Sequence, residues 1–250
     1  MFYELAVGFG DVPGHSRVAI LGVLPDIDDG TEPEDVWPDG GLYSWLPSAR
    51  ALVAKSSSAN DTAAGTGART LVLVGLESPT STEETTVSIT LAGTSASAET
   101  IPFYRINQLR VSSAGSGEVN AGDIRLYDAS DGTTVRHAML AGSGLAQCCV
   151  YTPPLGYTLQ IVSTYIGVNR ADAAGGTRYA TFANYFKSGT VKRLPLNINC
   201  SSIAPYRHDG IPGFMVNGMT DYCMRCMDVS HANTNVTAAF LGILRRNRSS

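Results

Sequence analysis

Two cysteines, Cys223 and Cys226, have the spacing of half a zinc knuckle, and Cys148, Cys200 or His208 could supply further ligands. The surrounding sequence, TDYCMRCMDVS, is typical of a β-strand, and residues three apart on a strand point to opposite faces of the sheet. The pattern therefore predicts buried thiols that pack as small hydrophobic groups, with zinc binding and thiol oxidation as the alternatives. We expect no metal site.

The acidic run DIDDGTEPED, residues 26–35, offers carboxylate oxygens of the kind that calcium prefers. An EF-hand loop requires glycine at its sixth position, whereas Gly30 is fifth counted from Asp26, and no helices flank the run. We therefore expect a solvated acidic loop, with an adventitious calcium site as the alternative.

The stretch SSSANDTAAGTGARTLVLVGLES, residues 56–78, superficially resembles a glycine-rich phosphate loop. A Walker loop requires lysine after its last glycine, but alanine follows Gly67. A dinucleotide-binding loop leads into a helix, whereas residues 70–74 are β-branched and aliphatic, which indicates a strand. We therefore expect no nucleotide and no other cofactor.

The same stretch has the composition of a turn that leads into a strand. Asn60 and Asp61 can cap a turn with their side chains, and Gly65 and Gly67 are expected at positive-φ positions. Because residues 71–74 are apolar on both faces of the pleat, this strand is expected to be covered twice, by a second sheet and by another element such as a neighbouring subunit.

Nucleophilic catalysis finds no support in the sequence. No Gly-x-Ser-x-Gly motif occurs, and the histidines His15, His137, His208 and His231 are scattered. In Arg207-His208-Asp209 the base and the acid are adjacent, which is not the geometry that a catalytic pair requires, so His208 is expected to be a surface residue. We predict that the chain is not an enzyme; the alternative, an enzyme on a β-sandwich, would use His208.

Composition narrows the remaining classes. With 250 residues, 44% hydrophobic residues and a net charge of −4, the chain is typical of a soluble globular protein without a basic surface for nucleic acid. No window approaches eighteen apolar residues, so no membrane span is expected. Five cysteines and the absence of a signal-like start favour synthesis in a reducing cytoplasm. The cationic cluster at 244–248 is expected to be a solvated tail or a docking tail for an acidic neighbour.

Strand-forming residues dominate the chain, whereas charged residues are only 16% and Glu, Lys and Gln are scarce. Turn-rich spacing between short β-branched runs indicates an all-β sandwich or barrel. Residues 174–186 could form a short helix, although two glycines there weaken it. The expected strands are residues 17–24, 51–54, 70–76, 85–91, 104–111, 123–127, 135–140, 157–166, 191–196, 221–229 and 236–244.

The first 48 residues differ from the rest, because five prolines and the acidic run interrupt them. Proline is disfavoured in central strands, so residues 1–48 are expected to form an extended arm over the body or over a neighbouring subunit. No long linker and no internal repeat divides the remainder, and residues 49–250 are therefore expected to form a single domain.

A resemblance to a known family rests mainly on the block Ser-x-Asn-Asp-Thr-Ala-Ala-Gly-Thr-Gly-Ala-Arg-Thr, and also on FYRINQLRVSSAGS, NAGDIRL and YCMRCMDVSHANTNVTAAFLGIL. Over residues 30–245 the chain resembles tailed-bacteriophage virion proteins described as head decoration, cement or head-fibre proteins. The cysteine pairs and the acidic run depart from that family's pattern.

The resemblance implies a jelly-roll-like antiparallel β-sandwich, assembled as a homotrimer on the capsid surface of a virion and bridging neighbouring major capsid proteins. The alternative is a glycan- or receptor-binding jelly-roll module on a fibre or tail. Aromatic and arginine side chains dominate interface energies. The expected interface residues are Phe2, Tyr3, Phe9, Trp37, Tyr43, Trp45, Arg245, Arg246 and Arg248, although burial of the tryptophans in the core is an equal alternative.

Overall fold

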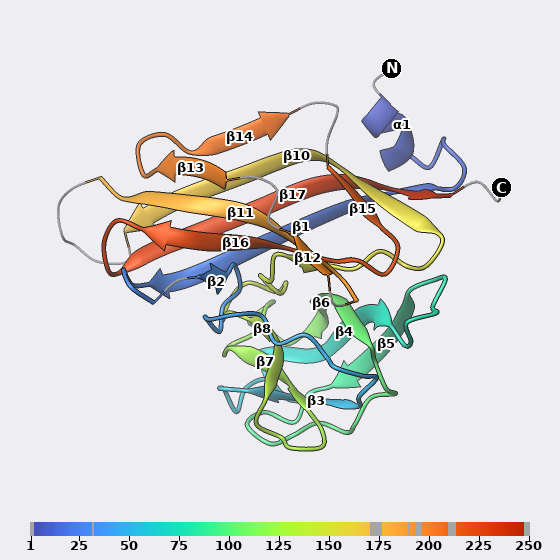
Figure 1. The fold of residues 1–250 in the computed structure, drawn as a ribbon. Helices are drawn as coiled ribbons and strands as arrows, with labels where there is room; N and C mark the ends of the chain where they lie inside the picture. Colours follow the sequence, from blue (N-terminus) through green and yellow to red (C-terminus); the bar gives the residue numbers. More distant parts are fainter. Residues whose placement is uncertain are drawn as a thin grey trace. The chain divides into compact units, whose positions relative to one another are not determined.

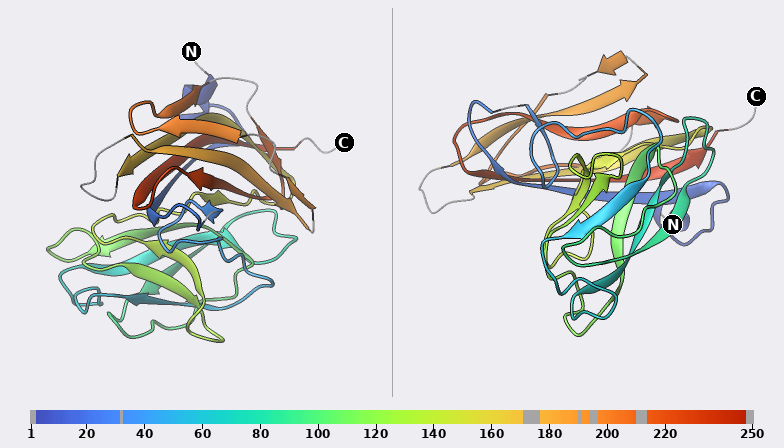
Figure 2. Two further views of the ribbon diagram at one scale, coloured as in Figure 1. Left: turned by 60° about the vertical axis from the view of Figure 1, so that its left-hand side comes forward. Right: turned by 90° about the horizontal axis from the view of Figure 1, so that it is seen from below.

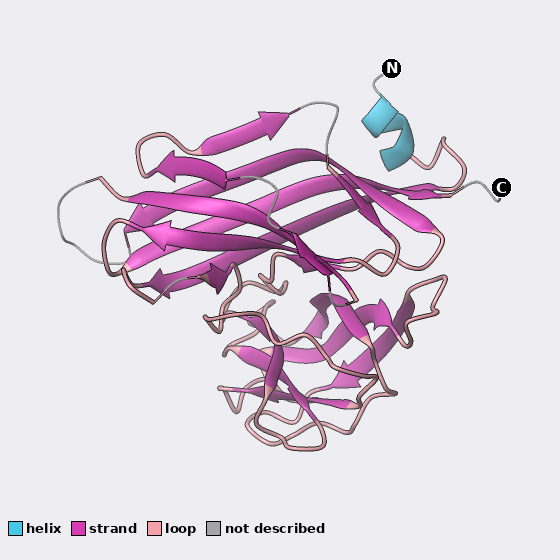
Figure 3. Cartoon of the chain, viewed as in Figure 1, coloured by secondary structure: helices cyan, strands magenta, loops and turns pink. Residues whose placement is uncertain are grey.

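The computed structural model describes residues 3–31, 33–170, 177–189, 191–193, 197–209 and 214–247. The described chain is all-β, with antiparallel sheets and one short helix, α1 (Tyr3–Gly8), as Figure 3 shows. The predicted fold class is therefore confirmed at the level of an all-β chain with antiparallel sheets. None of the described helical residues belongs to a helix that is long and apolar enough to cross a membrane.

Every strand expected from the sequence overlaps a strand of the structure, and the longest ones extend further than expected. These are β1 (His15–Ile27), β10 (Tyr157–Arg170) and β17 (Thr234–Arg246). The segment considered as a helix instead contains the start of β11 (Tyr179–Ser188), because its aromatic and β-branched residues pair with neighbouring strands on both sides. The other strands that the sequence did not indicate have five residues or fewer and depend on pairing with a longer strand.

The chain forms two compact units. The larger one consists of Met1–Leu42 and Cys149–Ser250, and the smaller one, Tyr43–Cys148, is inserted between those segments. This division differs from the expected arm of residues 1–48 and single body of residues 49–250. Residues 1–42 group with the C-terminal part because β1 (His15–Ile27) pairs with β17 along most of its length.

The N-terminal prolines lie where a strand tolerates them. Pro13 precedes β1, and Pro25 lies at the register shift between Leu24 and Ile27. β1 is also the first strand of its sheet, so that within the sheet it pairs only with β17. The constraint on proline is thus met by an edge strand, and the segment is not the extended arm that was expected.

The larger unit has two antiparallel sheets (Figures 1 and 2). The first has the order β1-β17-β10-β14, where β14 is Tyr206–Asp209, and β15 (Met215–Asn217) also pairs with β10. The second contains β12 (Val191–Arg193), β11, β16 (Asp221–Val229) and β2 (Glu34–Asp35) in that order. There β13 (Asn197–Ser201) also pairs with β11, and β9 (Val150–Tyr151) with β16.

The core of the larger unit is formed by the inward residues of both sheets. Alternate residues of β17, such as Val236 and Phe240, are buried against alternate residues of β16, such as Tyr222 and Met224. Rings of Tyr222 and Phe240 meet edge to face with centroids 5.1 Å apart. On the outer face of the first sheet, Val7 of α1 joins a small separate cluster with residues of β10 and β17.

The smaller unit has two three-stranded sheets. One has the order β3-β7-β8, and comprises β3 (Leu52–Ser56), β7 (Ile124–Asp128) and β8 (Val135–Met139). The other has the order β5-β4-β6, and comprises β5 (Thr85–Thr90), β4 (Ala68–Leu76) and β6 (Arg105–Ala114). Leu71 and Leu73 of the central strand β4 are fully buried in a core that both sheets share.

Candidate functional site

Asp61 is buried, and its carboxylate is the centre of the glycine-rich turn. Its Oδ1 accepts hydrogen bonds from the backbone N–H groups of Ala68 at 2.7 Å and Ala121 at 2.8 Å. Its Oδ2 accepts one from the Ser56 hydroxyl at 2.6 Å and one from the N–H of Gly122 at 2.9 Å. These neutral donors from separate segments satisfy a buried carboxylate. We name this arrangement, residues 56–68 with 121–122, the Asp61 turn.

Glycine is required in the Asp61 turn for space. A Cβ atom on Gly67 would overlap Oδ1 of Asp61, and one on Gly65 would overlap the carbonyl of Asn60. Neither glycine is among the residues with positive φ, so the prediction of positive-φ positions was wrong. The capping role predicted for Asp61 is confirmed, and the glycines allow the backbone to approach the capped carboxylate closely.

In the Asp61 turn, the carboxylate of Asp61 takes the place of the anion that a phosphate loop would bind. Such a loop offers backbone N–H groups to an anion. Here the N–H groups of Ala68, Ala121 and Gly122 already donate to the carboxylate of the chain's own Asp61. The stretch then continues directly into β4, as expected for a turn that leads into a strand.

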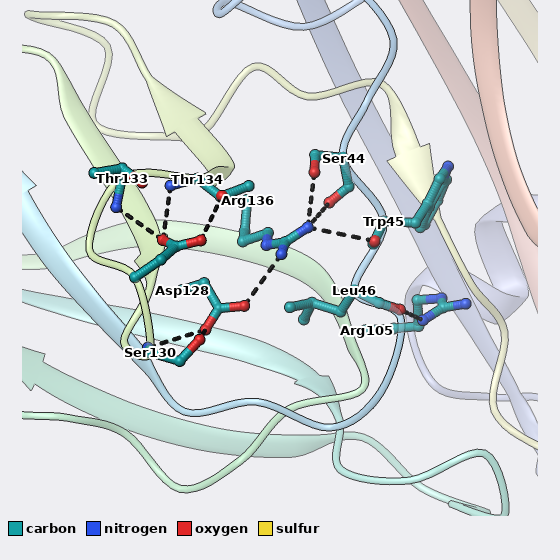
Figure 4. Close-up of polar contacts among 10 residues, drawn as sticks. Ser44, Trp45, Leu46, Arg105, Asp128, Ser130, Thr133, Thr134 and Arg136 are labelled. Carbon is teal, nitrogen blue, oxygen red and sulfur yellow. Dashed lines mark hydrogen bonds and ion pairs between the residues drawn. The ribbon is translucent and has the colours of Figure 1, made fainter.

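A second polar cluster of the smaller unit surrounds Arg136 (Figure 4). Its guanidinium lies 3.1 Å from Oδ2 of Asp128, and Nη1 donates to the hydroxyl of Ser44 at 2.7 Å. The neighbouring Arg105 donates to the carbonyl of Leu46 at 2.8 Å and stacks on the ring of Tyr104, 3.9 Å from its centroid. The two arginines thus hold the segment 44–46 against the β-strands that carry them.

The electrostatics of this cluster favour the ionised pair. Burial opposes the charge of Asp128, but hydrogen bonds from Ser130 and the Arg136 guanidinium outweigh it, so the pKa of Asp128 lies below its ordinary value. Both side chains are largely buried, with 10% of Arg136 and 4% of Asp128 exposed. A pair that is enclosed and mutually bonded serves packing, and neither group faces solvent as an acid or a base would.

His137 is buried, whereas the scattered histidines suggested no interior site. A hydrogen bond of 3.0 Å joins its Nδ1 to the hydroxyl of Tyr43. Burial disfavours the charged imidazolium and lowers the pKa of His137 to about 3. His137 is therefore neutral at physiological pH and acts as a core residue with one polar contact.

The larger unit buries its own ion pair. Asp35 is fully buried, and its carboxylate accepts hydrogen bonds from Nε of Arg225 at 2.7 Å and from Nη2 at 3.1 Å. The thiol of Cys223 donates to Oδ1 of Asp35 at 3.2 Å, and the Arg225 guanidinium lies over the ring of Tyr185. Burial opposes the charge of Arg225, but the bonds to Asp35 prevail and raise the pKa of Arg225 above its ordinary value.

The five cysteines are all buried, which confirms the expectation of thiols packed as small hydrophobic groups. Cys226 lies in the core of the larger unit, whereas Cys223 contacts Asp35 on the other face of β16, so residues three apart diverge as expected. Burial raises the pKa of Cys200 to about 12 and also raises the pKa of Cys223. In the part of the chain that the structure describes, no three His, Cys, Asp or Glu side chains gather as metal ligands.

The end of the acidic run is buried and forms a strand, whereas a solvated loop was expected for the whole run. Glu34 and Asp35 at its end are buried and form β2. Glu34 accepts hydrogen bonds from the N–H of Gly41 and the hydroxyl of Thr31. Asp28 is exposed and accepts a bond from the N–H of Asn233. The part of the run that pairs with β16 therefore has a structural role that its charge alone did not indicate.

The residues expected at interfaces fall into three groups. Trp37 is buried, so for it the core alternative holds, and Trp45 is half-buried. Tyr43 is also buried, although it was expected at an interface. Phe2 and Arg248 lie outside the described residues, and of Tyr3 only its place in α1 is described. The side chains that reach solvent are Phe9, Arg245 and Arg246.

α1 and the C-terminal end of β17 lie at one end of the larger unit (Figure 1). Phe9 follows α1 directly, and 73% of it is exposed. The N–H of Arg246 donates to the carbonyl of Gly14 at 2.9 Å, so the end of β17 lies beside the turn that connects α1 to β1. We name this end, with Phe9, Arg245 and Arg246, the terminal corner.

Sequence reasoning missed the exposed side chains at the other end of the larger unit. Tyr179 begins β11 with 57% of its surface exposed, and Ile203, in the turn after β13, has 78% exposed. The sequence did contain a signal, because Tyr179 alternates with the apolar residues Ala180 and Phe182 as on a strand with one buried face. In the structure, Ala180 and Phe182 are buried and Tyr179 is on the outward face.

Comparisons with known proteins establish no relationship. No family model and no curated protein matches the chain. The structure of infectious bursal disease virus Gt strain is 10% identical, with 100% of this chain and 83% of that chain covered, at a TM-score of 0.22. For the Gx strain of the same virus the identity is 10%, the coverage 94% and 77%, and the TM-score 0.20. Scores this low establish neither a shared fold nor kinship.

Proposed function

We propose that this chain is a structural virion protein of a tailed bacteriophage, which decorates the head and cements it by bridging neighbouring major capsid proteins. The observation that carries the proposal is the block of residues 58–70, on which the resemblance to head decoration proteins mainly rests. This block builds the Asp61 turn, whose carboxylate and backbone donors bind one another. A distinctive block with an architectural role fits a family whose function is architectural.

We further propose that the larger unit is a jelly-roll-like β-sandwich. Its two antiparallel sheets share one core, and their strands come from both ends of the chain, with β1 beside β17. Such a sandwich supplies a rigid body from which loops and edges can reach partners. The proposal also includes a homotrimer, in which one edge of each subunit meets a different edge of the next.

The terminal corner is the contact that we propose for the capsid. An exposed phenylalanine and two exposed arginines at one end of the unit have the composition of interface residues with high binding energy. Arg245 and Arg246 end β17, whose inner residues are anchored in the core, so the corner is attached to a rigid strand. Its charge suits an acidic patch on the shell protein, and many weak contacts on one particle add up to tight retention.

The test is attachment of the purified protein to phage heads that lack it. We expect sedimentation of the protein with expanded heads and a higher temperature of head disruption. The double variant Arg245→Ala/Arg246→Ala should attach about tenfold more weakly, and attachment of the unchanged protein should weaken as salt concentration rises. A matched control is Arg207→Ala, an exposed arginine on β14, away from the corner.

Either of two results would contradict the proposal. One is that the intact protein does not bind heads of any maturation state. The other is that binding occurs but the terminal-corner variant and the Arg207→Ala control behave alike, which would remove the corner from the proposed contact.

A further inference from the structure

The second sheet of the larger unit presents an exposed aromatic ring beside polar groups on its outward face. Inward residues of β11 are Ala180 and Phe182, both in the core, so Tyr179 and Thr181 point outward. More than half of Tyr179 is exposed, at the start of the strand. We name the outward group of Tyr179, Thr181, Asn199 and Asp228 the Tyr179 platform.

Strand register places the polar members of the platform in one row. Thr181 pairs with Asn199 of β13 on one side and with Asp228 of β16 on the other. Neighbouring Ile198 and Val229 are buried in the core, so Asn199 and Asp228 share the outward face with Thr181. Diagonal neighbours on a sheet are about 7–8 Å apart, which brings the row within reach of a molecule stacked on Tyr179.

Hydrogen bonds within the protein orient part of the Tyr179 platform. The hydroxyl of Thr181 donates to Oδ1 of Asn199 at 2.8 Å, which fixes the amide with its N–H₂ group available as a donor. The hydroxyl of Ser230 receives a bond from the N–H of Tyr179 at 3.0 Å, and this ties the aromatic residue to the turn after β16. Among the described residues, no hydrogen bond or ion pair engages the exposed carboxylate of Asp228.

We propose that the Tyr179 platform binds a saccharide. A pyranose has an apolar C–H face, which can stack on an aromatic ring, and a rim of hydroxyl groups, each of which is both donor and acceptor. The platform offers the ring, a donor in Asn199 and an acceptor in Asp228. A flat, uncharged surface of a partner protein would leave the carboxylate of Asp228 without a partner when buried, whereas a sugar hydroxyl satisfies it.

The location of the platform suits recognition of an outside ligand. β10 begins beside the terminal corner, where Tyr157 pairs with Arg246, and ends at Arg170 opposite Thr234. The platform lies at this second end, because Tyr179 is bonded to the turn at 230–233 that leads into β17. The two sites are therefore separated by the length of β10, about 40 Å. If the terminal corner is bound to a capsid, the Tyr179 platform at the other end of the unit remains exposed to ligands in solution.

Affinity for one sugar unit on an open platform is expected to be weak, in the millimolar range, because little surface is buried. Many copies on one particle would raise the avidity by about 10²–10⁴ against a sugar-coated surface. This amplification rests on the proposed function, whereas binding of a saccharide to the isolated chain does not.

The experiment uses the full chain and saturation-transfer NMR with the methyl glycosides of glucose, galactose, mannose, rhamnose and N-acetylglucosamine. We expect at least one of them to show transfer. Tyr179→Ala should weaken its binding about tenfold, and Tyr179→Phe should retain it because the stacking ring remains. Tyr165→Ala is the matched control, an exposed tyrosine of β10 in the other sheet. Circular dichroism and thermal unfolding show that each variant is folded.

Three results would overturn the inference. The first is the absence of transfer to every glycoside, and the second is an equal loss in Tyr165→Ala and Tyr179→Ala. The third is that Tyr179→Ala weakens attachment to phage heads while no glycoside binds, which would make the platform a shell contact. Because head attachment is measured separately, failure of the cement function leaves the saccharide result interpretable, and the reverse also holds.

Discussion

Asp61 of the smaller unit and Asp35 of the larger unit are both fully buried, yet their charges are balanced in different ways. Asp61 accepts hydrogen bonds from backbone N–H groups and one hydroxyl, and no cation is among these partners. Asp35 instead faces the guanidinium of Arg225, which bonds to both of its oxygens. One carboxylate organises a turn from within, and the other joins two strands through an ion pair.

The two buried carboxylates depend on different parts of the chain. Apart from 121–122, the Asp61 turn is assembled from residues close in sequence, and glycines provide the space around the carboxylate. The Asp35–Arg225 pair joins residues 190 positions apart and depends on the register of β2 with β16. A carboxylate surrounded by backbone donors cannot be replaced without orphaning them, whereas an ion pair can be removed as a unit.

The largest expected effect is that of Asp61→Ala. The substitution leaves the buried N–H groups of Ala68 and Gly122 and the partly buried N–H of Ala121 without their acceptor, so the free energy of unfolding of the smaller unit should fall by about 4 kcal/mol. Urea denaturation in a Trp37→Phe background measures it, because Trp45 then reports on the smaller unit alone. The control Asn60→Ala, at an exposed neighbour, should change the free energy by less than about 0.5 kcal/mol. Equal losses in both variants would contradict the importance given to Asp61.

A smaller effect is expected for Arg225→Ala, which leaves the carboxylate of Asp35 buried without its cation. We expect a loss of about 3 kcal/mol from the larger unit, followed by Trp37 fluorescence in a Trp45→Phe background. The double variant Asp35→Ala/Arg225→Ala should lose less than the sum of the single losses, with a coupling of about 2 kcal/mol. Strict additivity would show that the pair contributes nothing beyond its separate side chains.

The smallest expected effect is a pH dependence of the free energy of unfolding of the smaller unit, which arises from its buried His137. The folded-state pKa of about 3 lies below the ordinary value of 6.5, so between these values the unfolded state binds the additional proton. Stability of the smaller unit is therefore full above pH 6.5 and falls with decreasing pH, by about 2 kcal/mol between pH 7 and pH 5. Hydrogen exchange at both pH values measures it. A His137→Gln variant should show a flatter dependence, and an unchanged slope would contradict this assignment.

The all-β class, most of the strands and the role of Asp61 could be predicted from the sequence, because they depend on local alternation and turn chemistry. It did not reveal the division into two units. No linker composition marks residues 42 and 148, and the decisive pairing joins β1 to β17 across most of the chain. Short strands such as β2 and β9 exist only through their pairing with β16, so their own residues carry little signal.

Among the candidate site residues, aromatic type alone did not distinguish surface from core. Tyr43 is buried because its hydroxyl finds His137, which lies 94 positions away. Phe9 is exposed because it follows the last turn of a six-residue helix whose Val7 already occupies the contact with the sheet. Tyr179 was overlooked because the strand that presents it was read as a possible helix, and without the strand its outward direction could not be inferred.

The insertion of the smaller unit has a practical consequence. Within the larger unit, the N–H of Cys149 donates to the carbonyl of Val36 at 2.9 Å, so the chain departs and returns through neighbouring points of one scaffold. Residues 43–148 could then be exchanged for another folded cargo whose termini are close together. If the chain coats a phage head, as we propose, a head coated with such chimaeras would display one copy of the cargo for each subunit.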